Sequence, residues 1–152
     1  MAEIDESRDL YICCAECIIE KEGKLLVIKR PKGVHAGGLF SFPGGKIEHF
    51  DGENGKNIFS EAAKREVLEE VGIRIVDPLQ LVTTSFFSDE ITGRPVVDCI
   101  FYCNAKNTDT TVHANQREVP EYHWLTREEL DTHPDAPVWV KRYTKLSNHV
   151  MS

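Results

Sequence analysis

Residues 44–73 read GGKIEHFDGENGKNIFSEAAKREVLEEVGI, a run that changes from glycine-rich to helical in character. Its second half, residues 58–71, contains four glutamates and two alanines and predicts a helix. Gly72 follows, and glycine is the residue type that most often ends a helix in the left-handed conformation. Two adjacent glycines upstream, Gly44 and Gly45, allow the backbone to approach a ligand closely. The segment therefore predicts a glycine-rich loop that leads into one long helix.

Three carboxylates share one face of this helix. Glu66, Glu69 and Glu70 stand at positions i, i+3 and i+4, where helical side chains are neighbours. Like charges at this spacing repel each other by roughly a few tenths of a kcal/mol per pair, and the helix dipole disfavours anions near the C-terminus. One explanation is a solvated face with salt bridges, because Arg65 stands four residues before Glu69 and Arg74 four residues after Glu70.

A divalent metal ion is the other explanation for this acidic face. Mg²⁺ takes a few carboxylate oxygens and keeps several waters, which leaves positions for substrate phosphates. The chain has 18 basic and 25 acidic residues, a net charge of −7. A phosphate substrate would need a cation or a local basic cluster to offset the repulsion. The same charge balance argues against a nucleic-acid polymer as partner.

The flanking sequence predicts mainly strands. Apolar and β-branched runs bounded by turn residues occur at 10–20, 24–30, 39–42, 79–87, 96–105 and 119–125. Residues 126–129 (TREE) fit a capping box that begins a short helix, and residues 137–149 predict a C-terminal helix. We expect an α+β fold in which strands pair mostly with near neighbours and the long helix packs on the sheet.

Composition is typical of one globular domain. A chain of 152 residues buries about two-thirds of its unfolded surface, so we expect residues 1–152 to form a single domain. No apolar run is long enough to span a bilayer, and the acidic residues 1–6 lack an apolar signal core, so we expect neither membrane association nor export. Five cysteines, an odd number, fit buried reduced thiols and a cytoplasmic location.

The central segment resembles the signature of the Nudix family, G-x5-E-x7-R-E-U-x-E-E-x-G-U, in which U is apolar. Residues 65–73 (REVLEEVGI) match its second half at every fixed position, and residues 42–48 (FPGGKIE) resemble the usual lead-in. The likeness covers about residues 10–133. It implies a single Nudix hydrolase domain with the Nudix fold, a mixed β-sheet sandwiched between α-helices.

Six extra residues separate the two halves of the signature. The family spacing from the box glycine to the arginine is fourteen, whereas Gly45 and Arg65 are twenty positions apart. In the family, a glutamate between them props the loop and pairs with the arginine. Glu53 follows a glycine as in the family, Asp51 fits a forward count, and Asn57 fits a backward count. Asn57 also fits the N-cap of the helix.

The resemblance implies roles for the residues around the signature. Mg²⁺, with Mn²⁺ as an alternative, is expected on Glu66, Glu69, Glu70 and the carbonyl of Gly44. The expected catalytic residues are Glu66, Glu69 and Glu118, with Glu66 or Glu118 as the base and Glu121 in reserve for Glu118. The substrate is expected to contact Lys29, Arg30, Gly45 and Glu48. Structural roles are expected for Arg65, Glu53 and Gly72.

The resemblance also implies a reaction. We expect Mg²⁺-dependent hydrolysis of a phosphoanhydride bond in a nucleoside diphosphate linked to another moiety, with a nucleoside triphosphate or related nucleotide as the default substrate. The alternative is a Nudix-fold module that binds a nucleotide or regulates without cleaving it. The intact carboxylates favour the hydrolase, and the disturbed loop favours the module. Outside the signature, we interpret Phe86 and Phe87 as core residues, with stacking on a base as the alternative. We interpret Trp124 as a packing residue, and Trp139 as core or as a contact of a homodimer.

Overall fold

The computed structural model describes residues 3–5 and 10–151. Of the acidic N-terminal segment discussed above, residues 1, 2 and 6 lie outside the described residues. Within the described part, every helix is too short or too polar to cross a lipid bilayer.

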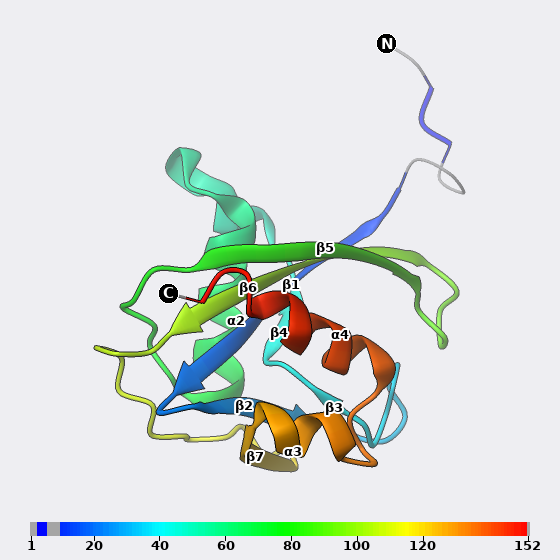
Figure 1. Cartoon of the computed structure of the whole chain (residues 1–152). Coiled ribbons are helices and arrows are strands. Elements are labelled where there is room, and N and C mark those ends of the chain that lie inside the picture. The colour runs from blue at the N-terminus through cyan, green and yellow to red at the C-terminus, as the bar shows by residue number, and fades with distance from the viewer. Residues whose placement is uncertain (1–2, 6–9, 152) are drawn as a thin grey trace.

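A seven-stranded mixed sheet forms the centre of the molecule (Figure 1). Its strands are β1 (Ile12–Lys21), β2 (Lys24–Lys29), β3 (Phe40–Ser41), β4 (Gly44–Lys46), β5 (Gln80–Ser88), β6 (Pro95–Asn104) and β7 (Glu121–Thr126). The order is β3-β2-β1-β6-β5, with β4 paired to β1 and β7 paired to β2. β1 and β6 run parallel, and the other pairs run antiparallel.

Strand pairing is less local than expected. β1 pairs with β6 over nine residues, from Ile12 beside Val96 to Glu20 beside Asn104, and β2 pairs with the distant β7. β1 and β2 pair only next to their turn, and β4 then takes the place beside β1. The expectation of mostly near-neighbour pairing is wrong, because apolar alternation identifies a strand without identifying its partner.

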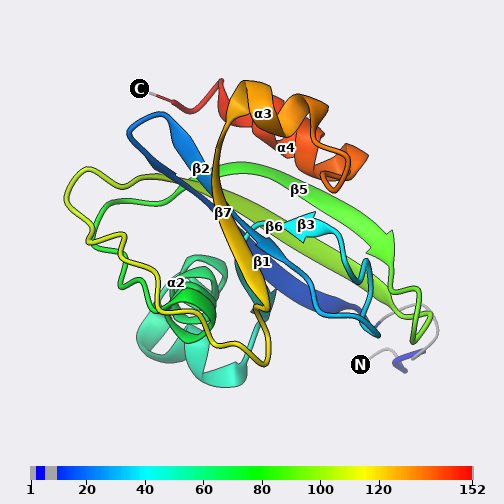
Figure 2. The same ribbon diagram turned by 90° about the horizontal axis from the view of Figure 1, so that it is seen from below.

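Helices cover both faces of the sheet (Figure 2), which confirms the expected α+β sandwich. α2 (Ile58–Val71) packs on one face, while α3 (Arg127–Thr132) and α4 (Val138–Ser147) pack on the other. The long helix and its end at Gly72 are as predicted, as is the capping box at Thr126. The six-residue insertion forms a short 3-10 helix, η1 (His49–Gly55), which the sequence did not predict.

Alternating residues of the strands pack into two separate hydrophobic cores, one on each face of the sheet. In β1, Ala15, Cys17 and Ile19 pack with α2, whereas Ile18 packs with α3 and α4. All five cysteines are free thiols. Cys17, Cys99 and Cys103 are buried, as expected for thiols that act as small apolar residues, and burial raises the pKa of Cys103 to about 12, whereas Cys13 and Cys14 are only partly buried. The sheet therefore has two chemically distinct faces, and this determines which side chains reach the site.

Candidate active site

The two ends of α2 are fixed by local chemistry. Asn57 is the N-cap, and its side chain accepts a hydrogen bond from the backbone N–H of Ser60. At the other end Gly72 has φ +71°, and a Cβ atom there would lie 2.8 Å from the Cβ of His113. The backbone N–H of His113 donates to Val71, so the loop that carries Glu118 is fastened to the end of the helix.

A cleft of about 670 Å³ opens beside this helix end, a volume suited to a nucleotide-sized ligand. It brings together seven of the residues expected at the site: Arg30, Gly44, Gly45, Glu48, Glu66, Glu70 and Glu118. These residues come from the position after β2, from β4, from the N-cap of η1, from α2 and from the loop before β7. Segments far apart in the chain thus converge on one concave surface.

Glu70 and Glu66 are crowded anions. The Glu70 side chain is buried and accepts a hydrogen bond of 2.7 Å from the backbone N–H of Gly44. Burial, with the charges of Glu66 and Glu118, raises the pKa of Glu70 to about 8. Burial also raises the pKa of Glu66, although Arg65 opposes that shift. A cation bound among these carboxylates would relieve the electrostatic cost of gathering them.

Gly45 makes room for one of these carboxylates. A Cβ atom at this position would lie 2.5 Å from the carboxyl carbon of Glu66. Only glycine therefore lets the Glu66 carboxylate lie against the backbone of β4. This close approach gives the box glycine of the signature a physical reason.

Arg65 connects the carboxylates to the inserted loop. Its Nη1 donates to Glu66 at 2.9 Å and to Glu69 at 3.1 Å. Its Nε and Nη2 donate to the two oxygens of Asp51 at 2.8 and 3.0 Å. Asp51, which is buried, is therefore the partner that pairs with the arginine, and the role expected of Glu53 is wrong. Glu53 is exposed because it lies where the backbone of η1 becomes extended.

Glu69 and Glu70 differ although both lie on the acidic face. The Glu69 side chain is 52% exposed and lies at the rim with Arg65, outside the lining of the cleft. Glu70 turns inward to Gly44 instead of pairing with Arg74, which lines a separate hollow of about 400 Å³. The salt bridge from Arg65 to Glu69 forms as expected.

Two expected site residues point away from the cleft. Lys29 donates to Asp135 at 3.2 Å and lies 3.5 Å from Glu121, its partner across β2 and β7. Along β2, Ile28 packs on the α2 side and Val27 on the α3–α4 side, so alternation places Lys29 on the latter. The substrate contact expected of Lys29 is therefore wrong, and Glu121 is not a substitute for Glu118.

The donor atoms of the cleft fit a hard divalent cation. Glu66, Glu70 and Glu118 supply carboxylate oxygens, the ligand type that Mg²⁺ prefers. The Nη1 atom of Arg65 already holds one positive charge between Glu66 and Glu69. Among residues 3–5 and 10–151, no three Asp, Glu, His or Cys side chains are arranged as a complete metal site.

The cleft is also lined by residues that sequence reasoning missed. Glu16 and Asp98 line it from β1 and β6, and Trp139 and Tyr143 line it from α4. Burial and the neighbouring Asp98 raise the pKa of Glu16 well above its usual range. An acidic residue in an otherwise apolar strand was the signal available for Glu16 and for Asp98.

The aromatic assignments were only partly correct. Trp124 packs against the core on the α2 side, as predicted. Phe86 is 62% exposed, and Phe87 is half-buried and stacks on His35 with 4.7 Å between ring centroids, so neither is a core residue. Both line the cleft, and the alternative of stacking on a base stays a prediction. Both lie on β5, an edge strand whose residues are half covered. Trp139 packs against the core on the α3–α4 side and also lines the cleft.

Comparison with known proteins agrees with this geometry. The model of the NUDIX domain family matches residues 13–146. The chain therefore belongs to the Nudix family, as a Nudix pyrophosphohydrolase.

The individual relatives are distant in sequence, but the alignments with this chain cover most of each relative's length. The chain is 26% identical to the CTP pyrophosphohydrolase of Escherichia coli (strain K12) over 132 residues, 79% of each chain. It is 32% identical to the 8-oxo-dGTP diphosphatase of Proteus vulgaris over 93 residues, 54% of this chain and 77% of that one. The crystal structure of the MutT protein from Methanosarcina mazei Go1 has the same fold, with a TM-score of 0.74 and 23% identity over 93% of this chain and 96% of that one.

Proposed function

We propose that this chain hydrolyses a phosphoanhydride bond in a nucleoside triphosphate or a related nucleotide. The observation that carries the proposal is the meeting of Glu66, Glu70 and Glu118 on one wall of a nucleotide-sized cleft. The named activities of the two curated relatives, on CTP and on 8-oxo-dGTP, support the substrate class.

We propose Mg²⁺, or Mn²⁺ in its place, as the cofactor. Glu66 and Glu70 would hold it, with Glu69 from the rim and the carbonyl of Gly44. The chemistry that the cation supplies when bound is charge neutralisation at the phosphate oxygens and activation of water. Without it, the cleft would present several carboxylates to a polyanion.

The chain's own residues supply positioning and proton transfer. Arg30 lines the cleft, and its Nε donates to the carbonyl of His35 at 2.6 Å, which orients the guanidinium to receive a phosphate. Gly45 and Glu48 line the same end of the cleft. Glu66 and Glu118 are the candidates for the general base, because both are carboxylates at this wall.

The inserted loop gives no support to a non-catalytic module. Asp51 supplies the carboxylate that Arg65 needs, so the longer loop keeps the arginine in place. Arg65 in turn contacts Glu66 and Glu69. The feature that favoured the alternative is thus accommodated by the fold.

The test is release of phosphate or pyrophosphate from a nucleotide panel that includes CTP and 8-oxo-dGTP, with Mg²⁺, with Mn²⁺ and with a chelator. We expect metal-dependent turnover that falls by about a hundredfold or more in Glu66→Gln and in Glu69→Gln. Glu61→Gln is the matched control, because Glu61 lies in the first turn of the same helix and lines the separate hollow instead of the acidic end. Turnover that needs no metal, or that survives both Glu66→Gln and Glu69→Gln, contradicts the proposal.

A further inference from the structure

Two buried polar atoms of the described chain lack a hydrogen-bond partner, Ser41 Oγ and Asp98 Oδ1. Both residues line the cleft. Buried polar atoms in native proteins are almost always paired, so an unpaired one that faces a cavity points to a bound partner. Asp98 is the stronger indication, because it is only 2% exposed and carries an acidic oxygen.

Asp98 is held in place by its neighbour on the sheet. β1 and β6 run in register, with Cys14 beside Asp98 and Glu16 beside Ile100, so Glu16 and Asp98 are diagonal neighbours on one face. Their carboxyl groups hydrogen-bond to each other. No donor of the described residues reaches Asp98 Oδ1, so this oxygen is left as an acceptor in a residue that lines the cleft.

Glu16 and Asp98 lie on the opposite face of the sheet from the carboxylates proposed to hold the metal, and Glu16 also lies beside Gly44. Ile100 packs with α4, which identifies the sheet face that Glu16 and Asp98 share. Glu66 and Glu70, in contrast, come from α2 on the opposite face. The cleft thus has an acidic end at α2 and a second polar point at the wall formed by α4.

The surroundings of the pair suit a nucleobase better than a phosphate. Tyr143 and Trp139 of α4 line the cleft there, and the charges of Glu16 and Asp98 reach the hydroxyl of Tyr143. Aromatic walls bind flat rings, whereas a carboxylate acceptor repels a phosphate. An acceptor among aromatic side chains requires a ligand that brings an N–H donor to a planar edge.

We propose that Asp98, oriented by Glu16, accepts a hydrogen bond from the exocyclic amino group of the substrate's base. The chain then prefers nucleotides whose base carries an amino group, such as cytosine or guanine, over uracil and hypoxanthine. With uracil a carbonyl would face the Asp98 oxygen, and two acceptors repel each other. This inference rests on the proposed function only in taking the bound molecule to be a nucleotide.

The test measures binding without cleavage. Nucleoside monophosphates contain no anhydride bond, so CMP can be compared with UMP and GMP with IMP by NMR titration of the full chain. We expect the amino-bearing member of at least one pair to bind about tenfold more tightly. Equal binding within both pairs, or no binding of any of the four, overturns the proposal.

Two substitutions locate the effect. Asp98→Val removes the acceptor and should reduce the preference to near one. Glu16→Gln keeps an N–H that can donate to Asp98 and should retain the preference. A preference that survives Asp98→Val in a protein with native-like melting overturns the assignment, whatever the wild-type binds.

The outcome is separable from that of the hydrolysis assay. Selective binding by a chain that cleaves no triphosphate supports base recognition and contradicts the proposed function. Metal-dependent cleavage with equal binding of the monophosphates supports the proposed function and contradicts base recognition.

Discussion

At the scale of single residues, Asp51 shows how an altered signature is accommodated. It accepts two hydrogen bonds from Arg65 and a third from the backbone N–H of Glu48. The same carboxylate therefore caps η1 and fixes the arginine that contacts Glu66. Residue counting left three candidates for this position, because counting cannot give the path of a six-residue insertion.

Asp51→Asn tests this pairing. The change leaves Arg65 without its buried counter-charge, and we expect a loss of about 3 kcal/mol in the free energy of unfolding in urea. Asp131→Asn is the control, because Asp131 is exposed and lies 3.8 Å from Lys145; we expect little change. Equal effects of the two substitutions would contradict the structural role of Asp51.

The cost of Asp51→Asn should also depend on pH. The hydrogen bond from Arg65 holds the pKa of Asp51 below its usual range. A depressed pKa stabilises the fold above the unfolded value of about 3.9, and this contribution is lost as the pH falls through the folded value. The difference between wild type and variant should therefore shrink below about pH 4. An unchanged difference in acid would show that the charge of Asp51 is not responsible.

At the scale of elements, the end of α2 joins helix stability to the site. Gly72 closes the helix in the left-handed conformation, and the backbone N–H groups of His113 and Asn115 donate to the carbonyls of Val71 and Glu70. The bounds of this helix were predictable from composition and from the glycine. The short elements β4 and η1 were not predictable from the sequence. β4 has three residues and η1 is an interrupted 3-10 helix, and neither leaves a periodic pattern of apolar residues.

Gly72→Ala separates crowding from backbone strain at this point. Its matched control is Gly93→Ala, since Gly93 has φ +72° but no heavy atom within 4 Å of an added Cβ. Both changes should cost about 1 kcal/mol of strain, and Gly72→Ala should cost more because the new Cβ meets His113. We also expect Gly72→Ala to lower kcat, since the displaced loop carries Glu118. Equal stability losses and unchanged turnover would contradict this coupling.

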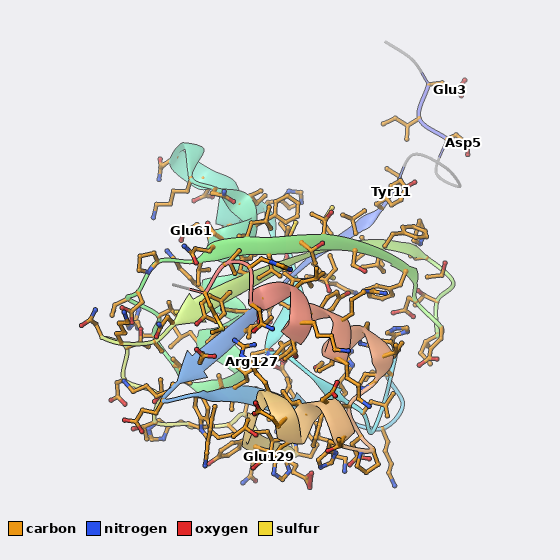
Figure 3. All side chains as sticks on the ribbon, in the orientation of Figure 1. Glu3, Asp5, Tyr11, Glu61, Arg127 and Glu129 are labelled. Carbon is orange, nitrogen blue, oxygen red and sulfur yellow. The ribbon has the colours of Figure 1, made fainter. Side chains whose placement is uncertain are left out.

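At the scale of the whole molecule, the cleft depends on how the helices are held against the sheet. Arg127, labelled in Figure 3, donates to Glu20 of β1 at 2.8 Å and to Ser147 of α4 at 2.7 Å. It thereby fixes α4, whose Trp139 and Tyr143 line the cleft, against the sheet. The hydrogen bonds of Arg127 therefore hold the α4 side of the cleft in a fixed position relative to β1.

Metal binding should stabilise the whole fold. A cation that binds only the folded chain adds about 2.7 kcal/mol at a hundred times its Kd, enough to raise Tm by several degrees. We expect Mg²⁺ to raise the Tm of the wild type but not that of Glu66→Gln, with NaCl at equal ionic strength as the control. A rise of equal size in the variant would argue against metal binding by Glu66.

The sequence by itself determined the family, the long helix with its acidic face and most strands. These features depend only on the spacing and periodicity of residues that are close together in the chain. Only the tertiary structure decided that Asp51 holds Arg65, that Lys29 faces away, and that Glu16 meets Asp98. Each of these depends on which distant strand or loop becomes a neighbour. Local patterns fix the direction of a side chain within its element, whereas packing between elements fixes what it meets.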